Sequence, residues 1–334
     1  AFSTAASSSG TAGSALTVQP VIEARDASGN RVTGFTGAVT LEVYSNSTCT
    51  AAVTTNPDGG ALLSATANPV TSVSGLATFA NLALSRASTL YLKATSSTYE
   101  TPCSGAMVIS AGAFSLAKST LTVSASTLNS GASITATLTA KDVYANSAPT
   151  GITSASFSLN SGGGSFGSVT AQGSGVYTSS YTATTSGTAT IGALINGSAI
   201  TDTETLTISP GTVATIEFST QPSATGSAGT ALTSQPAVEG LDAAGNRATG
   251  FTGSVTLALF SDSTCATSVT TNLDGGAALT ATSNPKTAVS GLATFAALKM
   301  TRAGTFYLRG VHWRYSSSGF MDNQPGAAAG SVPG

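Results

Sequence analysis

Two stretches of the chain decide its fold: GTAGSALTVQPVIEARDASGNRVTGFTGAVTL, which begins at Gly10, and GSAGTALTSQPAVEGLDAAGNRATGFTGSVTL, which begins at Gly226. The starting points lie 216 residues apart, and the match continues without a gap beyond the quoted residues. Over residues 10–92, 54 of 83 positions are identical to residues 226–308. Identity of this extent at one fixed offset identifies two copies of a single module.

The residues between the copies form a third module. It spans residues 113–210 and has strand-like segments of its own, such as SITATLTAKD, GVYTSSYTAT and TATIGALING. The copies then occupy residues 1–112 and 211–334. Only a few residues separate neighbouring modules, so we expect adjacent modules to be held close together rather than to float on long linkers.

Hydrophobic alternation with a period of two runs through each copy. Val39, Leu41 and Val43 alternate with Thr40 and Glu42, which is the pattern of a half-buried strand. Several such short strands, separated by turns rich in Asp and Gly, predict a sandwich of two sheets. The sequence therefore predicts an all-β chain of three immunoglobulin-like β-sandwich domains in a row.

Composition excludes several classes of function. Hydrophobic residues make up 41% of the chain, whereas charged residues make up only 8% and the net charge is −2. The chain lacks the cluster of Lys and Arg needed to neutralise phosphates, so we expect no nucleic-acid partner. Because no apolar run approaches the roughly 20 residues that span a bilayer, we also expect no membrane insertion.

Several segments resemble a known family. FSTQPSATGSAGTAL, GFTGSVTLALFS and AVSGLATFAALKMTRAGTFYL in the second copy resemble the bacterial immunoglobulin-like repeats of large surface and secreted proteins, including the invasin and intimin type. TLTAKDVYANSAPTG in the middle module resembles the same class. The resemblance implies an extracellular or cell-surface location. Such repeats mostly act as spacers, so it implies little about a ligand.

Three cysteines suit an oxidising compartment. In a secreted module, the natural pairing is a disulfide between Cys49 and Cys103. The repeat offset places Gly319 where the second copy would need the partner of Cys265. We therefore expect Cys265 to be a free thiol or to bond another chain.

The turns Asp26–Asn30 and Asp242–Asn246 are candidate calcium ligands. A calcium site needs about six to eight oxygens, usually from several converging carboxylates. Each turn contains a single acid. We therefore expect Asp and Asn to bond their own backbone, with Gly in the left-handed conformation, and we predict neither a metal nor a cofactor.

The stretch from Val311 to Tyr315 holds the only histidine, His312, with Trp313 and Tyr315. No Gly-x-Ser-x-Gly elbow and no convergent set of acid, base and nucleophile accompany this histidine, so we predict no enzyme. Trp313 and Tyr315 are possible contacts for a sugar or a partner, although a strand end and its loop explain them equally.

The two copies differ at their ends. Ala1 and Phe2 align with Glu217 and Phe218, so we expect a shortened first strand in the first copy. At the other end, residues 322–326 form a poor strand, so the second copy is predicted to lack its last strand and to carry a flexible tail from about residue 316. Open strand edges of this kind suit pairing with copies of the chain or with neighbouring modules.

These observations lead to two functional hypotheses. The first is a structural extracellular protein, a stalk or fibre-forming subunit of a bacterial cell-surface appendage. The second is an adhesin or carbohydrate-binding module that uses loops at one end of a sandwich to contact a host surface or a glycan.

Overall fold

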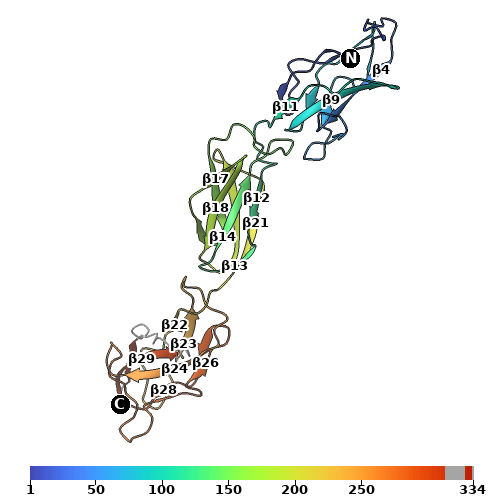
Figure 1. Ribbon diagram of the computed structural model, residues 1–334. Coiled ribbons are helices and arrows are strands. Elements are labelled where there is room, and N and C mark those ends of the chain that lie inside the picture. Colours follow the sequence, from blue (N-terminus) through green and yellow to red (C-terminus); the bar gives the residue numbers. More distant parts are fainter. Residues whose placement is uncertain (313–327, 333–334) are drawn as a thin grey trace.

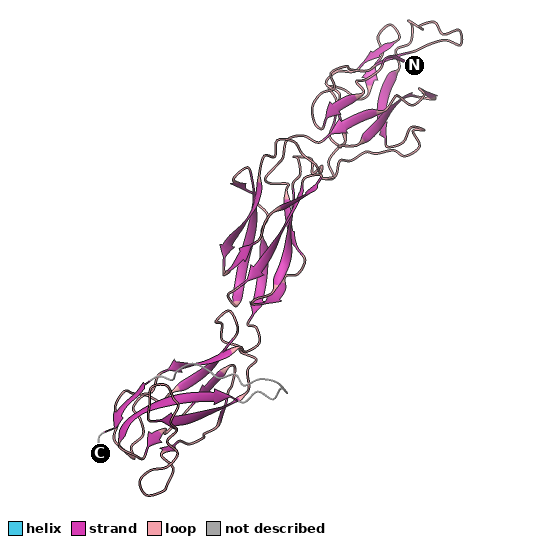
Figure 2. Cartoon of the chain, turned by 60° about the vertical axis from the view of Figure 1, so that its left-hand side comes forward, coloured by secondary structure: helices cyan, strands magenta, loops and turns pink. Residues whose placement is uncertain are grey.

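The computed structural model describes residues 1–312 and 328–332, which form three sandwich modules lying end to end (Figures 1 and 2). We name them module 1 (1–112), module 2 (113–210) and module 3 (211–334). All regular elements in the described ranges are strands, which confirms the predicted all-β class of tandem immunoglobulin-like domains. Nothing in these ranges is a helix that could cross a bilayer.

The strands are short and numerous. Module 1 contains β1 Phe2–Thr4, β2 Ser9–Thr11, β3 Val21–Glu23, β4 Ala38–Tyr44, β5 Leu63–Ser64, β6 Val70–Thr71, β7 Leu76–Thr78, β8 Ala83–Leu84, β9 Thr89–Ser96, β10 Tyr99–Glu100 and β11 Met107–Ser110. Module 2 contains β12 Thr120–Val123, β13 Thr127–Asn129, β14 Ser133–Thr139, β15 Ala155–Ser161, β16 Gly164–Phe166, β17 Thr170–Gly173, β18 Val176–Ala183, β19 Gly187–Ile195, β20 Ser198–Ala199 and β21 Glu204–Ser209. Module 3 contains β22 Thr215–Thr220, β23 Ala237–Leu241, β24 Ser254–Phe260, β25 Leu279–Thr280, β26 Lys286–Thr287, β27 Leu292–Thr294, β28 Lys299–Met300, β29 Gly304–His312 and β30 Ala328–Val332.

Each module is built from two main sheets. In module 1 these sheets have the strand orders β1-β3-β7 and β2-β11-β9-β4-β6, and in module 2 the orders are β12-β14-β18-β16 and β13-β21-β19-β15. Module 3 repeats the pattern with β22-β23-β27 and β26-β24-β29-β30. In modules 1 and 2, a short strand near the start of the module pairs in parallel with the last strand, β2 with β11 and β13 with β21.

Every module has its own hydrophobic core between its sheets. Val39, Leu41 and Val43 on β4 are at most 5% exposed, and Leu90 and Leu92 on β9 are fully buried. The alternation read from the sequence is therefore confirmed. The buried residues of each core all belong to one module, so the contacts between modules are made at the module ends.

The ends of the two copies correct one prediction. Module 3 does have a last strand: β30 pairs with β29, with Phe306 opposite Ala329, where Leu90 faces Met107 in module 1. The 216-residue offset aligns Met107 with residue 323, but in module 3 the strand that pairs with β29 comes later, at Ala328–Val332. This segment is rich in Ala and Gly, and such small residues do not produce a visible hydrophobic alternation. β1 is indeed shorter than its copy β22. Most of the tail after residue 316 lies outside the described residues.

Candidate functional site: the joints between modules

Each module carries one five-residue segment that begins with Asp and ends with Asn, and we call these segments the Asp–Asn turns: Asp26–Asn30, Asp142–Asn146 and Asp242–Asn246. In all three, the Asp Oδ1 accepts the backbone N–H groups two and four positions later at 2.9 Å. The Asn Nδ2 donates back to the same carboxylate. The fourth residue has a positive φ in each turn. These local bonds confirm the backbone role expected for the first and third turns.

The turn of module 2 also bonds module 1. Asn146 Nδ2 donates to the carbonyl of Ser85 at 3.0 Å, and the N–H of Ala87 donates to Asn146 Oδ1 at 2.8 Å. The amide side chain thus satisfies one acceptor and one donor of the neighbouring module, as a strand partner would. Asp142 Oδ2 accepts the N–H of Gly112, in the linker, at 2.9 Å. Asp142 is fully buried and Asn146 is 2% exposed, so these bonds are shielded from water.

Two further contacts brace the joint between modules 1 and 2. The ring of Tyr144 packs against the core of module 1. It lies so close to Gly13 that an added Cβ there would be 2.3 Å from Tyr144 Cε2. Lys118 Nζ forms an ion pair with Asp58 at 2.8 Å, with both side chains partly exposed. The ring contributes burial, whereas an exposed ion pair contributes little.

The joint between modules 2 and 3 uses the same bonds. Asn246 Nδ2 donates to the carbonyl of Thr184 at 2.8 Å, and the N–H of Ser186 donates to Asn246 Oδ1 at 3.0 Å. Asp242 Oδ2 accepts the linker N–H of Gly211 at 2.8 Å. Ser130 Oγ adds a further bond to the same oxygen. One construction therefore joins all three modules.

Asp242 is held ionised by this arrangement. Its burial opposes the charged form, but the hydrogen bonds from Ser130, Gly211 and Asn246 outweigh that effect and hold the pKa of the carboxyl well below its usual range. The negative charge therefore belongs to the joint at neutral pH.

Metal binding finds no support in these turns. Within residues 1–312 and 328–332, no group of three or more His, Cys, Asp or Glu side chains converges. In the turns of modules 2 and 3, the oxygens that would have to serve a cation already accept N–H groups.

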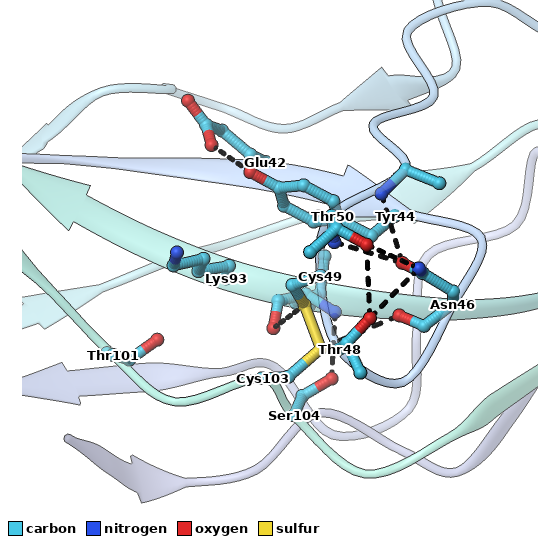
Figure 3. The surroundings of a disulfide bond; sticks show 12 residues. Glu42, Tyr44, Asn46, Thr48, Cys49, Thr50, Lys93, Thr101, Cys103 and Ser104 are labelled. Carbon is cyan, nitrogen blue, oxygen red and sulfur yellow. Dashed lines mark hydrogen bonds between the residues drawn. A yellow bond between two sulfur atoms is a disulfide. The ribbon is translucent and has the colours of Figure 1, made fainter.

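Cys49 and Cys103 lie side by side in module 1 (Figure 3). Cys49, in the loop after β4, and Cys103, in the segment before β11, form a disulfide with an S–S distance of 1.93 Å. Cys265, the copy of Cys49, is a free thiol that is only 4% exposed. Next to the disulfide, the hydrogen bond from Tyr44 Oη to Glu42 Oε2 (2.6 Å) and the burial of the ring raise the pKa of Tyr44 to about 12.

The loop of Cys265 keeps its shape through other bonds. Asp262 stands where Asn46 stands in module 1, and its carboxylate accepts the N–H groups of Ala266 (3.1 Å) and Thr267 (2.7 Å). Hydrogen bonds from Thr264, Ala266 and Thr267 hold the pKa of Asp262 well below its usual range. A charged hydrogen-bond acceptor thus organises the loop in the module that lacks the disulfide.

His312 makes structural contacts. Its Nδ1 donates to the carbonyl of Ser254 at 3.0 Å, across the β24–β29 pair, and its ring meets the edge of Phe251 with centroids 4.8 Å apart. Trp313 and Tyr315, the proposed ligand contacts, lie outside the described residues.

The sequence interpretation missed the role of the turns. The first and third were recognised as turns, but the middle one, DVYAN, lacks the Gly that marks the others, because Ala145 takes the left-handed conformation (φ 63°). A signal was present: Asp and Asn recur four residues apart in each module, about 30 residues after each linker glycine.

Comparisons with known proteins give one match to a family model and several similar solved structures. Residues 115–211 match the family model described as Invasin, domain 3, which is less than a third of the chain. No curated protein matches the chain. Among solved structures, FdeC, described as an Escherichia coli adhesin, is 21% identical with a TM-score of 0.42, over 99% of this chain and 94% of that one.

Two other solved structures are similar to a comparable degree. Invasin, described as a bacterial integrin-binding protein, is 18% identical with a TM-score of 0.37, over 93% of this chain and 55% of that chain. InvD of Yersinia pseudotuberculosis is 19% identical with a TM-score of 0.39, over 94% of this chain and 84% of that chain. At TM-scores below 0.5, these similarities carry no argument about ligands, partners or the arrangement of modules.

The match to the family model coincides with module 2, the segment whose sequence resembles invasin-like domains, and that resemblance is thereby confirmed. Module 2 is therefore similar to invasin domain 3 over residues 115–211, and the chain is a tandem array of immunoglobulin-like sandwich modules.

Proposed function

We propose that this chain is a rod-like segment of a bacterial cell-surface adhesin, in which bonded joints hold successive immunoglobulin-like modules at a set angle. The recurrence of one bond set at both joints carries the proposal. At each joint an Asn amide exchanges two hydrogen bonds with the preceding module, and an Asp takes the N–H of the linker. A flexible chain of modules would not need the same set of hydrogen bonds at both joints.

The disulfide and the composition of the chain support an extracellular location. The Cys49–Cys103 disulfide suits an oxidising compartment. A surface of hydroxyls and small side chains, with 8% charged residues in the chain, offers no patch for nucleic acid.

The adhesin assignment is favoured over a fibre-forming subunit. The joint bonds are satisfied within one chain, and β30 supplies the strand that a neighbouring subunit would otherwise have to donate. The similarity of residues 115–211 to invasin domain 3 supports the same choice.

Distances between spin labels test the rod. Cysteines introduced at exposed Val73, Val169 and Leu273, taken in neighbouring pairs, report on the two joints. Narrow distance distributions at both joints are expected, and distributions as broad as those of an unstructured linker would contradict the proposal.

Adhesion is tested separately. Bacteria that display the chain on their surface are expected to adhere to host cells, and a chain with loosened joints should adhere less well. If binding resides in this chain itself, the soluble chain binds cells or glycans and Trp313→Ala weakens that binding.

A further inference from the structure

The Asp–Asn turn of module 1 has the same internal hydrogen bonds as the two turns at the joints, but it is exposed to solvent. Asp26 and Asn30 are exposed, whereas Asp142, Asn146 and Asp242 are buried. Within residues 1–312 and 328–332, the Asn30 side-chain amide donates only to Asp26 Oδ2, at 3.3 Å. Asn30 Oδ1 and Asp26 Oδ2 are equivalent to the atoms that accept N–H groups across the other joints, and neither accepts an N–H from another module within the described residues. Asp26 Oδ1 already holds the turn in its bonded shape.

A pocket of about 330 Å³ opens beside this turn. It lies between β3 and β9, and its apolar wall includes Ile22, Val32, Phe35 and Ala94. No atom of the Asp26–Asn30 turn lines the pocket, whereas Ala1 does.

Module 3 shows what fills the equivalent space. There Val213, a linker residue, packs against the module core. Its Cγ2 lies 3.0 Å from the position that a Cβ on Gly240 would take, next to Phe251, and the following N–H, of Ala214, donates to the carbonyl of Leu241 at 2.7 Å. Phe251 and Gly240 are the copies of Phe35 and Ala24, both of which line the pocket of module 1.

We propose that the Asp26–Asn30 turn and its adjoining pocket form a docking seat for a further immunoglobulin-like module joined ahead of Ala1. The incoming module presents a backbone carbonyl and, two residues later, a backbone N–H to the Asn30 amide. Its linker donates an N–H to Asp26 Oδ2 and places one apolar side chain in the pocket. This inference rests on the proposed rod.

The charges around the pocket do not call for a charged ligand. Glu23, on the pocket wall, accepts hydrogen bonds from Arg25 at 2.8 Å and from Arg31 at 2.6 Å. Glu100, also on the wall, pairs with Lys93 at 2.6 Å, so both acidic side chains of the wall have basic partners. The neutral amide, one carboxylate oxygen and the apolar pocket remain available, and this is the set of groups that module 3 uses to hold module 2.

The occupant has to be tethered. A few hydrogen bonds and one apolar side chain do not offset the freedom that two separate molecules lose on association. A module on a short linker is already present at an effective concentration of the order of millimolar, so the same contacts suffice. A free second copy of the chain is therefore not the expected partner.

An extended chain tests the seat. Residues 113–216 are placed directly ahead of Ala1, since Ala1 stands where Glu217 follows residue 216. The added module then meets module 1 as module 2 meets module 3, except that Ala24 adds a methyl group where Gly240 stands. Spin labels across the new joint are expected to give a distance distribution as narrow as that of the joint between modules 2 and 3.

Variants of the extended chain decide the outcome. Asp26→Ala with Asn30→Ala should abolish the narrow distribution at the new joint alone, whereas Asp242→Ala with Asn246→Ala should abolish it only between modules 2 and 3. A polar replacement, Val213→Asp in the added segment alone, should also loosen the new joint. A broad new joint, or a narrow one that survives the Asp26 and Asn30 changes, overturns the inference. So does concentration-dependent association of the unextended chain that depends on Asn30.

The failure of this inference is distinguishable from failure of the proposed function. The joint between modules 2 and 3, measured in the same extended chain, reports on the rod itself. If that joint is narrow while the new joint is broad, the rod stands and only the docking seat is wrong.

Discussion

Asn146 and Ser85 belong to different modules, yet the side-chain Nδ2 of Asn146 donates to the backbone carbonyl of Ser85 at 3.0 Å. The Asn146 side chain is 2% exposed, and it supplies the hydrogen-bond donor that a neighbouring β-strand would otherwise provide to this carbonyl. Removing the Asn146 side chain therefore measures how much this bond contributes to the joint.

Asn146→Ala is expected to lower the free energy of unfolding by about 2 kcal/mol, because the carbonyl of Ser85 and the N–H of Ala87 lose a buried partner. Urea unfolding, with hydrogen exchange to assign the loss to the joint, measures the effect. Asn30→Ala is the matched control, since Asn30 is exposed and its loss should cost no more than roughly 0.5 kcal/mol. Equal losses in the two variants would contradict the assigned role.

Gly13→Ala should destabilise the chain more than Gly229→Ala. Both glycines have a positive φ, 78° and 79°, so the backbone strain of the replacement is the same. Only at Gly13 does the new methyl group meet the ring of Tyr144, whereas it meets nothing within 4 Å at Gly229. The excess in thermal unfolding should be about 1–3 kcal/mol, the usual range for overpacking. Combining Gly13→Ala with Tyr144→Ala should remove that excess.

Reduction of the Cys49–Cys103 disulfide is expected to destabilise module 1 by about 3–4 kcal/mol, because the bond closes a loop with a sequence separation of 54. Hydrogen exchange with and without reductant measures the change module by module. Module 3 is the internal control, since its loop has no disulfide, and an equal response of both modules would refute the prediction.

Acid should loosen the joint between modules 2 and 3. The pKa of Asp242 lies below its unfolded value of about 3.9, so the ionised carboxylate stabilises the joint above about pH 4, and this contribution is lost as the pH falls further. Label distances across this joint should therefore stay narrow from pH 7 to about pH 5 and broaden below about pH 4.

The variant Asp242→Asn tests whether the acid response comes from this carboxylate or from other acidic groups. The amide offers one oxygen in place of two, so the variant should already be looser at pH 7 and should show a smaller change in acid. An acid response as large as that of the unaltered chain would assign the effect to other groups.

Cys265 should resist thiol reagents in the native chain, because its side chain is 4% exposed. Labelling is expected only after unfolding, and non-reducing electrophoresis of native material should show no cross-link through this residue. A dimer abolished by Cys265→Ser would instead support the intermolecular bond that the sequence left open.

The modules and their strands follow closely from the sequence. The repeat offset marks the copies, and alternation at Val39, Leu41 and Val43 identifies the buried face, because a pleated strand exposes every second residue. These features are local or repetitive, so a single sequence reveals them.

The joints depend on contacts that a linear pattern does not encode. Asn146 and Ser85 lie 61 residues apart in the chain and meet only after both modules have folded. The last strand of module 3 was missed for a similar reason. A segment rich in Ala and Gly becomes a strand through its pairing with β29, not through any strand preference of its own.

Module 2 carries both halves of a coupling: its Asp–Asn turn bonds module 1 at one end, and its corner Thr184–Ser186 bonds module 3 at the other. Duplication of a whole module therefore leaves every coupling intact, and so does the deletion of one. The 216-residue offset spans two modules, which is the trace that such an event would leave in the gene. Recombination can thus change the length of the array in whole units, without any compensating point substitution.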